Sequence, residues 1–568
     1  MNIATTGLKP KDAYDVIVIG AGAGGLACAV VAANEGLETL VLEKTPYVGG
    51  TMSYAGGMAW SPNNPKKGEV GADDSIEKAE TYLNATAGTG ASADLRKAFL
   101  DSVEAAIGYL DRHTQVKMTP VPFYPDYYPD APCSTVNGRI MEPLPFDGRE
   151  LGRDFTKLRP PLPEFTLFGG MMVSRYDLPH FRNVFKSVRA FARVTRLIAE
   201  YAVQRVRHHR GTSLVLGNAL AARLLKSLQN LNVPIRLQTT VRALEYDQGR
   251  VTGVVIDTAD GPLSVKARKG VVLATGGFPH NAEMREKYLP PEASPYSAMA
   301  EGNTGDGINL GMHAGGFVPG DDGNDGYWSP VSRFKREDGS YAIYPHTVAD
   351  RGKPGFFAVN ADGRRFTNEA NSYHDFVKGM FKPVGNRAST PAWLVCDQAS
   401  LWKYGLGAVK PMHMGLKTHL KSGYIKKADT LEELAALTGV DAQGLKETAE
   451  RYNADAAQGI DNAFGRGGNV YHRYMGDPSV TPNPCMAPLE KPPYYAVELF
   501  AGTLGTAAGL KTNRTCQVVG KDGQPVPGLY ACGNDMNSIM AGTYPGPGIT
   551  LGPALVFGYV AGMHLAGR

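Results

Sequence analysis

Near the end of the chain, a tyrosine opens a loop of alternating prolines and glycines, Tyr544-Pro-Gly546-Pro-Gly548. The prolines have no backbone N–H and stiffen the loop, which leaves Gly546 and Gly548 as backbone donors without a side chain in the way. A tyrosine hydroxyl and one such N–H can together hold a carbonyl oxygen and stabilise an enolate, with about 3–4 kcal/mol per donor. The loop therefore predicts chemistry on a ketone.

The same region has no charged side chain between Asp535 and His564. Enzymes that act on dicarboxylates hold them with arginine, whose guanidinium binds a carboxylate through two parallel hydrogen bonds. We therefore expect the reacting part of the substrate to be neutral and apolar. The apolar residues 551–562 predict a helix, because Pro553 suits a first turn, and Gly558 and Gly562 would allow close packing.

A second constellation lies at the start of the chain. An apolar, β-branched run ends at Gly20, an alanine-rich helical stretch follows, and a second strand-like run ends at Glu43. In this G-x-G-x-x-G arrangement, Gly20 allows a tight turn, Gly22 lets the backbone approach a pyrophosphate, and Gly25 lets the helix pack close to the strand. Glu43 is placed to accept a hydrogen bond from a ribose hydroxyl. The pattern predicts a dinucleotide site.

Further glycine-rich segments, at residues 48–51, 54–58, 274–277 and 528–535, favour FAD over NAD. This spread resembles the flavoprotein family that includes fumarate reductases, aspartate oxidases and ketosteroid dehydrogenases. The resemblance implies an α/β fold, with a Rossmann-like FAD-binding domain of the glutathione-reductase type and an inserted α+β catalytic domain. The residues expected to bind FAD are Gly20, Gly22, Gly24, Gly25, Glu43, Lys44, Gly50, Thr51, Gly56, Gly57, Met58, Val241, Thr275, Gly276, Gly277, Asn534, Asp535, Gly548, Thr550 and Leu551.

The resemblance also implies which residues contact which part of FAD. It implies that the main chain of Val241 contacts the adenosine part and that Asn534 or Asp535 lies near the ribityl chain. Some members of the family attach FAD covalently through a histidine shortly after the acidic residue. Because residues 44–64 contain no histidine, we expect the FAD to be non-covalent.

Residues 543–554 resemble the T-Y-P-G-x-G-x-T-x-G-P-A signature of 3-ketosteroid Δ1-dehydrogenases (3-oxosteroid 1-dehydrogenases). In that family the matching tyrosine and the second glycine hold the ketone oxygen, which implies this role for Tyr544 and Gly548. A tyrosine also acts there as the base. The R-F-T-N-E-A-N-S-Y segment places that role on Tyr373.

A second tyrosine assists the base in these enzymes. The tyrosine-rich residues 123–130 resemble the segment that carries it, and we take Tyr127 as the assistant, while Tyr124 and Tyr128 remain open. The implied function is the FAD-dependent 1,2-dehydrogenation of a 3-ketosteroid or related cyclic ketone, with an external electron acceptor. The alternatives are a fumarate-reductase-like flavin enoate reductase and a non-catalytic flavin-binding sensor.

Length and composition limit the number of domains and the kinds of partner that we expect. A chain of 568 residues predicts two domains, which we expect at 1–293 plus 498–568 for FAD and at 294–497 for catalysis. The net charge of +4 is small and argues against a nucleic-acid partner. The six cysteines form no CxxC pair and predict no metal site. We find no secretory or transmembrane pattern and expect a cytoplasmic protein.

Residues 185–210 are rich in basic side chains, with apolar residues interleaved at helical spacing. A basic amphipathic helix of this kind can lie on an anionic bilayer. The simpler interpretation is a solvated basic helix that packs on the protein through its apolar side. Peripheral membrane contact is therefore one of two expectations for this segment.

Overall fold

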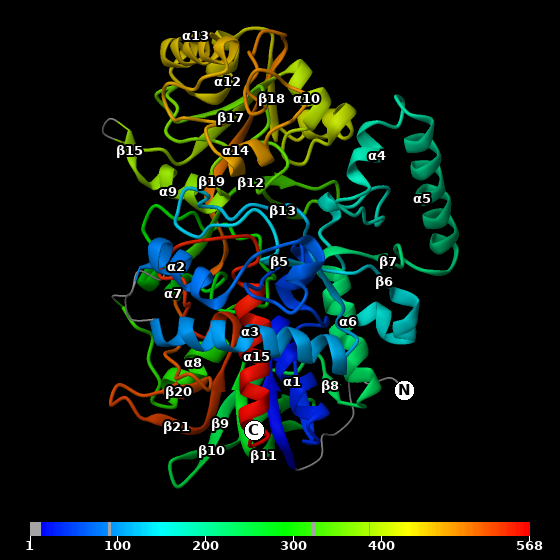
Figure 1. Cartoon of the computed structure of the whole chain (residues 1–568), viewed down its shortest axis with the longest axis vertical. Coiled ribbons are helices and arrows are strands. Elements are labelled where there is room, and N and C mark those ends of the chain that lie inside the picture. The colour runs from blue at the N-terminus through cyan, green and yellow to red at the C-terminus, as the bar shows by residue number, and fades with distance from the viewer. Residues whose placement is uncertain (1–12, 89–92, 321–324, 385–386) are drawn as a thin grey trace.

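The computed structural model describes residues 13–88, 93–320, 325–384 and 387–568 (Figure 1). An eight-stranded sheet occupies one end of the molecule, and a six-stranded sheet lies toward the other. Both sheets are built from segments that are far apart in the sequence. The long strand β19 begins in the six-stranded sheet, and its last residue, Thr506, accepts a hydrogen bond from Phe278 N, just beyond the eight-stranded sheet.

The eight-stranded sheet has the order β20-β21-β11-β1-β2-β8, and β10 and β9 extend it from β11. Strands β1, β2, β8, β11 and β21 run parallel where they pair, whereas β9, β10 and β20 pair antiparallel. The strands are β1 (Ala13–Ile19), β2 (Thr39–Leu42), β8 (Ile235–Arg236), β9 (Val241–Asp247), β10 (Arg250–Thr258), β11 (Gly261–Leu273), β20 (Gln517–Val519) and β21 (Pro525–Ala531).

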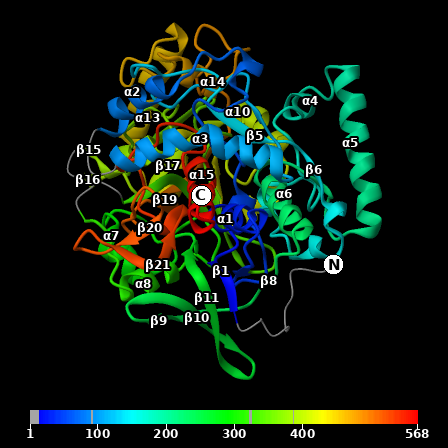
Figure 2. The same cartoon turned by 60° about the horizontal axis from the view of Figure 1, so that its bottom comes forward.

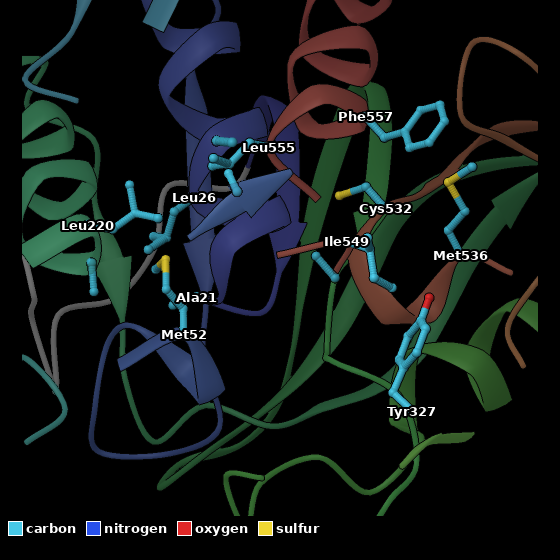
Figure 3. Packing of buried hydrophobic residues seen from close by; sticks show 14 of the residues in the cluster. Ala21, Leu26, Met52, Leu220, Tyr327, Cys532, Met536, Ile549, Leu555 and Phe557 are labelled. Carbon is cyan, nitrogen blue, oxygen red and sulfur yellow. The ribbon is translucent and has the colours of Figure 1, made fainter. Parts of the chain in front are cut away.

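Three helices pack beside this sheet, namely α1 (Ala23–Asn34), α6 (Leu216–Asn230) and α15 (Leu551–Leu565). Helix α1 contacts β1 and β2, α15 contacts β11, and α6 packs against α1. Helices α1 and α15 pack closely, because a Cβ at Gly558 would lie only 2.6 Å from Gly24 O. Figure 3 shows Leu26 of α1, Leu220 of α6 and Met52 gathered in the core between these helices.

The six-stranded sheet is antiparallel in every pairing and has the order β13-β12-β19-β17-β14, with β18 beside β19. Its strands are β12 (Gly326–Lys335), β13 (Tyr341–Pro345), β14 (Phe356–Val359), β17 (Ala392–Asp397), β18 (Ile425–Ala428) and β19 (Tyr494–Thr506). The expected domain boundary at residue 498 falls inside β19. Helices α9 (Tyr373–Phe381), α10 (Gln398–Tyr404), α12 (Leu431–Thr438), α13 (Ala442–Gln458) and α14 (Val470–Met475) accompany this sheet.

The remaining α-helices and strands lie outside these two sheets. They are α2 (Ile76–Ala87), α3 (Ala93–His113), α4 (Leu178–Arg182), α5 (Val188–Arg207), α7 (Ala282–Tyr288), α8 (Asp306–His313), α11 (Leu416–Lys421), β3 (Ala59–Trp60), β4 (Met118–Pro120), β5 (Ile140–Pro143), β6 (Phe146–Asp147), β7 (Ser213–Leu214), β15 (Pro383–Val384) and β16 (Arg387–Ala388). Figures 1 and 2 both show α5 standing apart from the body, with α4 beside its first turn.

Several expected elements form as predicted, including the first strand–helix–strand unit and the C-terminal helix α15. Strand β11 is continuous from Gly261 to Leu273 and ends just before the glycine-rich residues 274–277. Five of the six cysteines are buried, and Cys133 is exposed. Across the described ranges, no cluster of side chains suits a metal ion. No helix in that part of the chain is long and apolar enough to cross a membrane.

Candidate active site

A cavity of about 1990 Å³ joins the two ends of the molecule. Its lining includes the glycine-rich turn after β1, the second strand end at Glu43 and Tyr544 of the C-terminal loop. The volume exceeds the roughly 300–1,000 Å³ that is usual for a single small-ligand site. The cavity therefore has room for a dinucleotide together with a second molecule.

The glycines of the first turn divide their roles as the sequence predicts. A Cβ at Gly20 would lie 2.1 Å from Ala274 O, and one at Gly25 would lie 2.1 Å from Gly20 O. A Cβ at Gly22 would meet nothing within 4 Å, and Gly22 lines the cavity. The two outer glycines are thus required for backbone packing, while the middle one leaves its backbone open to a ligand.

Glu43 lies at the cavity wall and is held by the backbone. One of its carboxylate oxygens accepts from Ala21 N (2.9 Å) and the other from Thr45 N (2.8 Å). Each oxygen keeps a further lone pair for a ligand hydroxyl. The neighbouring Lys44 forms an ion pair with Asp306 (2.5 Å) at the start of α8, a contact that sequence reasoning missed.

Seventeen of the twenty residues expected to bind the cofactor line the cavity, and Gly25, Gly277 and Asp535 do not. The buried carboxylate of Asp535 instead accepts from Thr275 N (2.5 Å) and Gly277 N (2.9 Å). Burial raises its pKa, and these N–H bonds oppose the shift. In this structure Asp535 fixes the turn after β11, while Asn534 reaches the cavity.

The expected tyrosines meet in one cluster. Ring centroids are 5.7 Å apart for Tyr127 and Tyr373, 5.8 Å for Tyr127 and Tyr544, and 5.1 Å for Tyr373 and Tyr544. All three side chains are buried and line the cavity. Tyr124 lines it as well, whereas Tyr128 does not, and its hydroxyl donates to Asp375 (3.1 Å).

The protein environment keeps these phenols protonated at neutral pH. Burial raises the pKa of Tyr373 well above 10, the charge of Tyr544 adds to the rise, and hydrogen bonding with Tyr127 opposes it. Burial is also the main cause that raises the pKa of Tyr127 and of Tyr544. A tyrosine that loses its proton here would be a strong base, because the same burial disfavours the phenolate.

Two loops that carry these tyrosines are joined by a buried hydroxyl. Tyr82 on α2 donates to Pro545 O (2.6 Å) and accepts from Tyr128 N (3.3 Å). Tyr127 N also donates to Pro545 O (2.9 Å). The position of Tyr127 relative to the proline–glycine loop is therefore fixed by three hydrogen bonds.

Gly548 is required by its backbone conformation and by its surroundings. Its φ is +86°, and a Cβ would lie 2.3 Å from Met58 O. Its carbonyl accepts from Trp60 N (3.0 Å), and the Trp60 ring donates to Asp126 Oδ1 (3.0 Å). Asp126 is in turn paired with the buried Arg139 (2.8 Å). This chain of contacts gave no sequence signal, because its members lie in separate segments.

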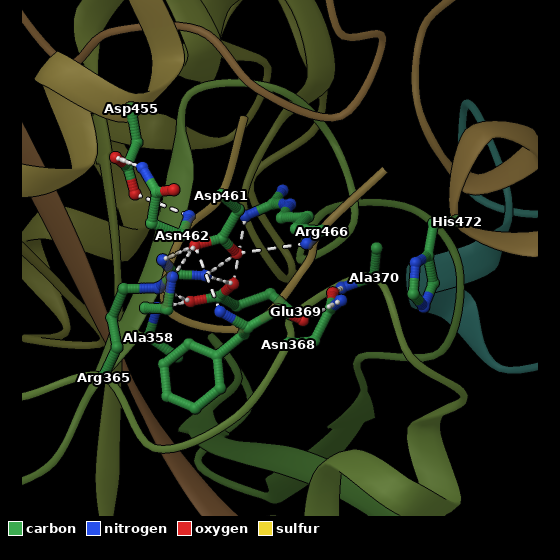
Figure 4. Close-up of polar contacts among 12 residues, drawn as sticks. Ala358, Arg365, Asn368, Glu369, Ala370, Asp455, Asp461, Asn462, Arg466 and His472 are labelled. Atoms are coloured by element: carbon green, nitrogen blue, oxygen red, sulfur yellow. Dashed lines mark hydrogen bonds and ion pairs between the residues drawn. The ribbon is translucent and has the colours of Figure 1, made fainter. Parts of the chain in front are cut away.

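A second buried ion-pair network holds the segment that leads to Tyr373. Arg365 contacts Glu369 (2.7 Å) and Asp461 (2.9 Å), and Arg466 contacts Glu369 (3.2 Å). Figure 4 shows these four side chains converging. Because buried charges are stable only when paired, the network fixes the turn from which α9 begins at Tyr373.

The family model described as FAD binding domain matches residues 15–551. The chain is 39% identical to a 4-oxocyclohex-2-ene-1-carboxylate 5-dehydrogenase of Sinomonas cyclohexanicum, over 98% of this chain and 94% of that protein. It is 37% identical to a 3-oxosteroid 1-dehydrogenase of Mycobacterium tuberculosis, over 97% of this chain and 98% of that protein.

A solved structure is similar over the whole length. The crystal structure of a 3-ketosteroid delta1-dehydrogenase from Sterolibacterium denitrificans, in complex with 1,4-androstadiene-3,17-dione, has a TM-score of 0.91 to this chain and 37% sequence identity. The match covers 98% of this chain and all of that one.

Proposed function

Because the chain belongs to the FAD-binding-domain family of flavoproteins, we propose that it is an FAD-dependent dehydrogenase that inserts a carbon–carbon double bond beside a ketone, with 3-ketosteroids as the substrate class. The observation that carries this proposal is the cluster of Tyr127, Tyr373 and Tyr544 in the cavity that also contains the glycine-rich turn. The relatives that act on 3-ketosteroids support the C1–C2 bond as the one oxidised.

In the proposed reaction, each residue of the site has a separate role. Tyr544 and the N–H of Gly548 donate to the ketone oxygen and stabilise the enolate as it forms. Tyr373 removes the proton from one carbon of the new double bond, and Tyr127 supports it through their hydrogen bond. Bound FAD supplies the hydride acceptor for the neighbouring carbon.

The two sheets have separate tasks in this proposal. The eight-stranded sheet and its helices hold FAD non-covalently, and the six-stranded sheet with α9 presents Tyr373. Tyr127 precedes the inserted domain and Tyr544 follows it. The site is therefore complete only when all three parts of the chain have packed together. An external acceptor reoxidises the flavin.

The first test is anaerobic mixing of the oxidised protein with androst-4-ene-3,17-dione, followed at about 450 nm, where oxidised flavin absorbs. We expect bleaching together with formation of the 1,4-diene. Tyr544→Phe should slow this step by about 10²–10³-fold, the usual effect of losing one oxyanion donor. Tyr341→Phe, at an exposed tyrosine outside the cavity, is the matched control. Unchanged turnover in Tyr544→Phe would contradict the mechanism, and no bleaching with any 3-ketosteroid would contradict the substrate class.

We also propose that the segment around α5 rests on an anionic lipid surface. Half of the exposed large hydrophobic side chains in the described residues lie between 165 and 206. Phe185, just before α5, is 85% exposed, and Val188, the first residue of α5, is 87% exposed. The opposite side of α5 packs on the protein through Val194 and Tyr201, so these exposed residues support a lipid contact alongside that packing. Arg210 does not belong to this surface, because it is buried against Asn218.

The charges of this segment match the partner. Basic side chains alternate with its exposed apolar ones, and apolar groups with cations together favour binding to anionic bilayers. The basic residues are Arg182, Lys186, Arg189, Arg193, Arg196, Arg205 and Arg207. Some residues of the segment also line the cavity, among them Phe185 and Leu178. An apolar substrate could thus pass from lipid to the site without crossing bulk water.

Vesicle flotation tests the lipid contact. We expect the protein to float with phosphatidylglycerol vesicles and much less with phosphatidylcholine, and the double variant Phe185→Ser/Val188→Ser to lose flotation. Ile460→Ser, at a position 58% exposed after α13, is the matched control and should float like the parent. Flotation that is absent, or equal in the double variant and the parent, would refute the contact.

A further inference from the structure

The part of the cavity away from the glycine-rich turn differs in charge from the tyrosine cluster. Its walls come from residues 161–186, 344–353, 398–414 and 474–479. The carboxylates that line this part each have a basic partner already. The pairs are Glu164 with Arg336 (2.9 Å), Asp350 with His346 (2.7 Å) and Asp477 with Lys403 (2.7 Å).

Several cations of the same walls have no such partner. Within the described residues, no carboxylate lies within 4 Å of the charged nitrogens of Arg182, Lys186, Lys353 or Lys410. The outer walls therefore carry an excess of positive charge. By contrast, the loop and helix between Asp535 and His564 carry no charged side chain.

Lys353 is the most enclosed of these cations. Its side chain is only 8% exposed, lines the cavity, and donates to Met475 O (2.6 Å) and Gly476 O (2.8 Å) at the end of α14. An ammonium group has three protons, so these two bonds leave one donor. Burial, and after it the charge of Arg182, lower its pKa to about 8, while Asp477 opposes the shift. A buried cation of this kind is stabilised by an anionic ligand.

The position of Lys353 relates it to the reacting end. The ring of Tyr471, on α14, lies 4.8 Å from that of Tyr127. Met475, whose carbonyl holds Lys353, follows four residues later, which is about 6 Å along a helix. The carbonyl that holds Lys353 thus lies about one helical turn along α14 from the ring that contacts Tyr127, and Lys353 and Tyr127 line the same cavity.

We propose that the substrate is a 3-ketosteroid that carries a carboxylate at the end remote from the ketone, and that Lys353 and Arg182 bind this carboxylate. The inference rests on the proposed function and refines its substrate class. The neutral tyrosine pocket takes the ketone ring, and the cationic walls take the acidic side chain. A relative that acts on an oxocyclohexene carboxylate is consistent with such a pairing of ketone and acid.

The test compares 3-oxochol-4-en-24-oic acid with its methyl ester, because the two share every ring atom. In the parent protein we expect kcat/KM to favour the acid by about tenfold or more, which corresponds to roughly 1.4 kcal/mol. The acid-to-ester ratio should fall toward one in Lys353→Met and also in Arg182→Gln. Arg182 is exposed, so its replacement does not threaten folding. Lys446→Met, which removes a lysine on α13 outside the cavity, should keep the parent ratio.

The pH dependence gives a second readout. The acid-to-ester ratio of kcat/KM should fall as the pH rises through about 8, where Lys353 loses its charge. The ratio cancels the ionisation of the tyrosines, which acts on both substrates. A ratio near one in the parent protein, at every pH, would overturn the proposal and leave the dehydrogenase function intact. Equal losses for acid and ester in Lys353→Met would likewise overturn it, because Lys353 would then only cap α14. Failure to oxidise any 3-ketosteroid would instead refute the proposed function.

Discussion

Replacing Tyr82 by phenylalanine removes one oxygen atom from the contact that joins the two tyrosine loops. The ring can keep its packing against Trp60, and Pro545 O still accepts from Tyr127 N (2.9 Å). Tyr128 N, however, loses the hydroxyl that lies 3.3 Å away. A buried N–H left without this acceptor costs about 1–3 kcal/mol of folding stability. Because small misplacements of catalytic groups can cost up to about 10²-fold, we expect kcat to fall by about 10–100-fold.

The assay measures kcat with androst-4-ene-3,17-dione and the free energy of unfolding in urea. The matched control is Tyr109→Phe, since Tyr109 is also a buried tyrosine whose hydroxyl donates to Glu35 (2.6 Å) and accepts from Asn34 (2.7 Å), but it does not line the cavity. Both variants should lose stability, and only Tyr82→Phe should lose turnover. If Tyr82→Phe is destabilised to the same degree as Tyr109→Phe but keeps the parent kcat, the hydroxyl serves folding alone and the reasoning is refuted.

Three further outcomes follow from the structure. Because the base must be a phenolate and burial raises the pKa of Tyr373 above 10, kcat should rise with pH across the alkaline range. A flat pH profile in the parent protein, or an unchanged rise in Tyr373→Phe, would contradict this expectation. Gly548→Ala should lower kcat by about 10²–10³-fold while retaining flavin absorbance, because the added Cβ would meet Met58 O. The control is Gly249→Ala, where φ is +79° but the surrounding space is open, so that it separates the effect of backbone strain from that of the clash. Glu369→Gln should lower the free energy of unfolding by about 3–5 kcal/mol, since it leaves Arg466 buried beside a neutral group, and urea denaturation that shows less than 1 kcal/mol would disprove the role of the network.

The sequence by itself determined the features that depend on short stretches of chain. The first turn requires Gly20 and Gly25 because a strand, a tight turn and a helix follow one another within a few residues, and Gly22 between them keeps the backbone open to a ligand. The prolines of the proline–glycine loop likewise stiffen it and restrict the position of Gly548. These patterns are local, so the elements they predicted, and the cavity-lining role of most cofactor residues, appear in the structure.

Only the tertiary structure decided which distant residues meet. The carboxylate of Asp535, for example, accepts a hydrogen bond from the backbone of Thr275 because β21 packs beside β11. Tyr82 is separated from Pro545 by 463 residues, and Lys353 from Gly476 by 123, so no sequence pattern links either pair. Side chains such as these act through buried contacts between separate elements. Their roles arise when the two sheets pack together, because burial and partner geometry, and not residue type, decide what each group can hold.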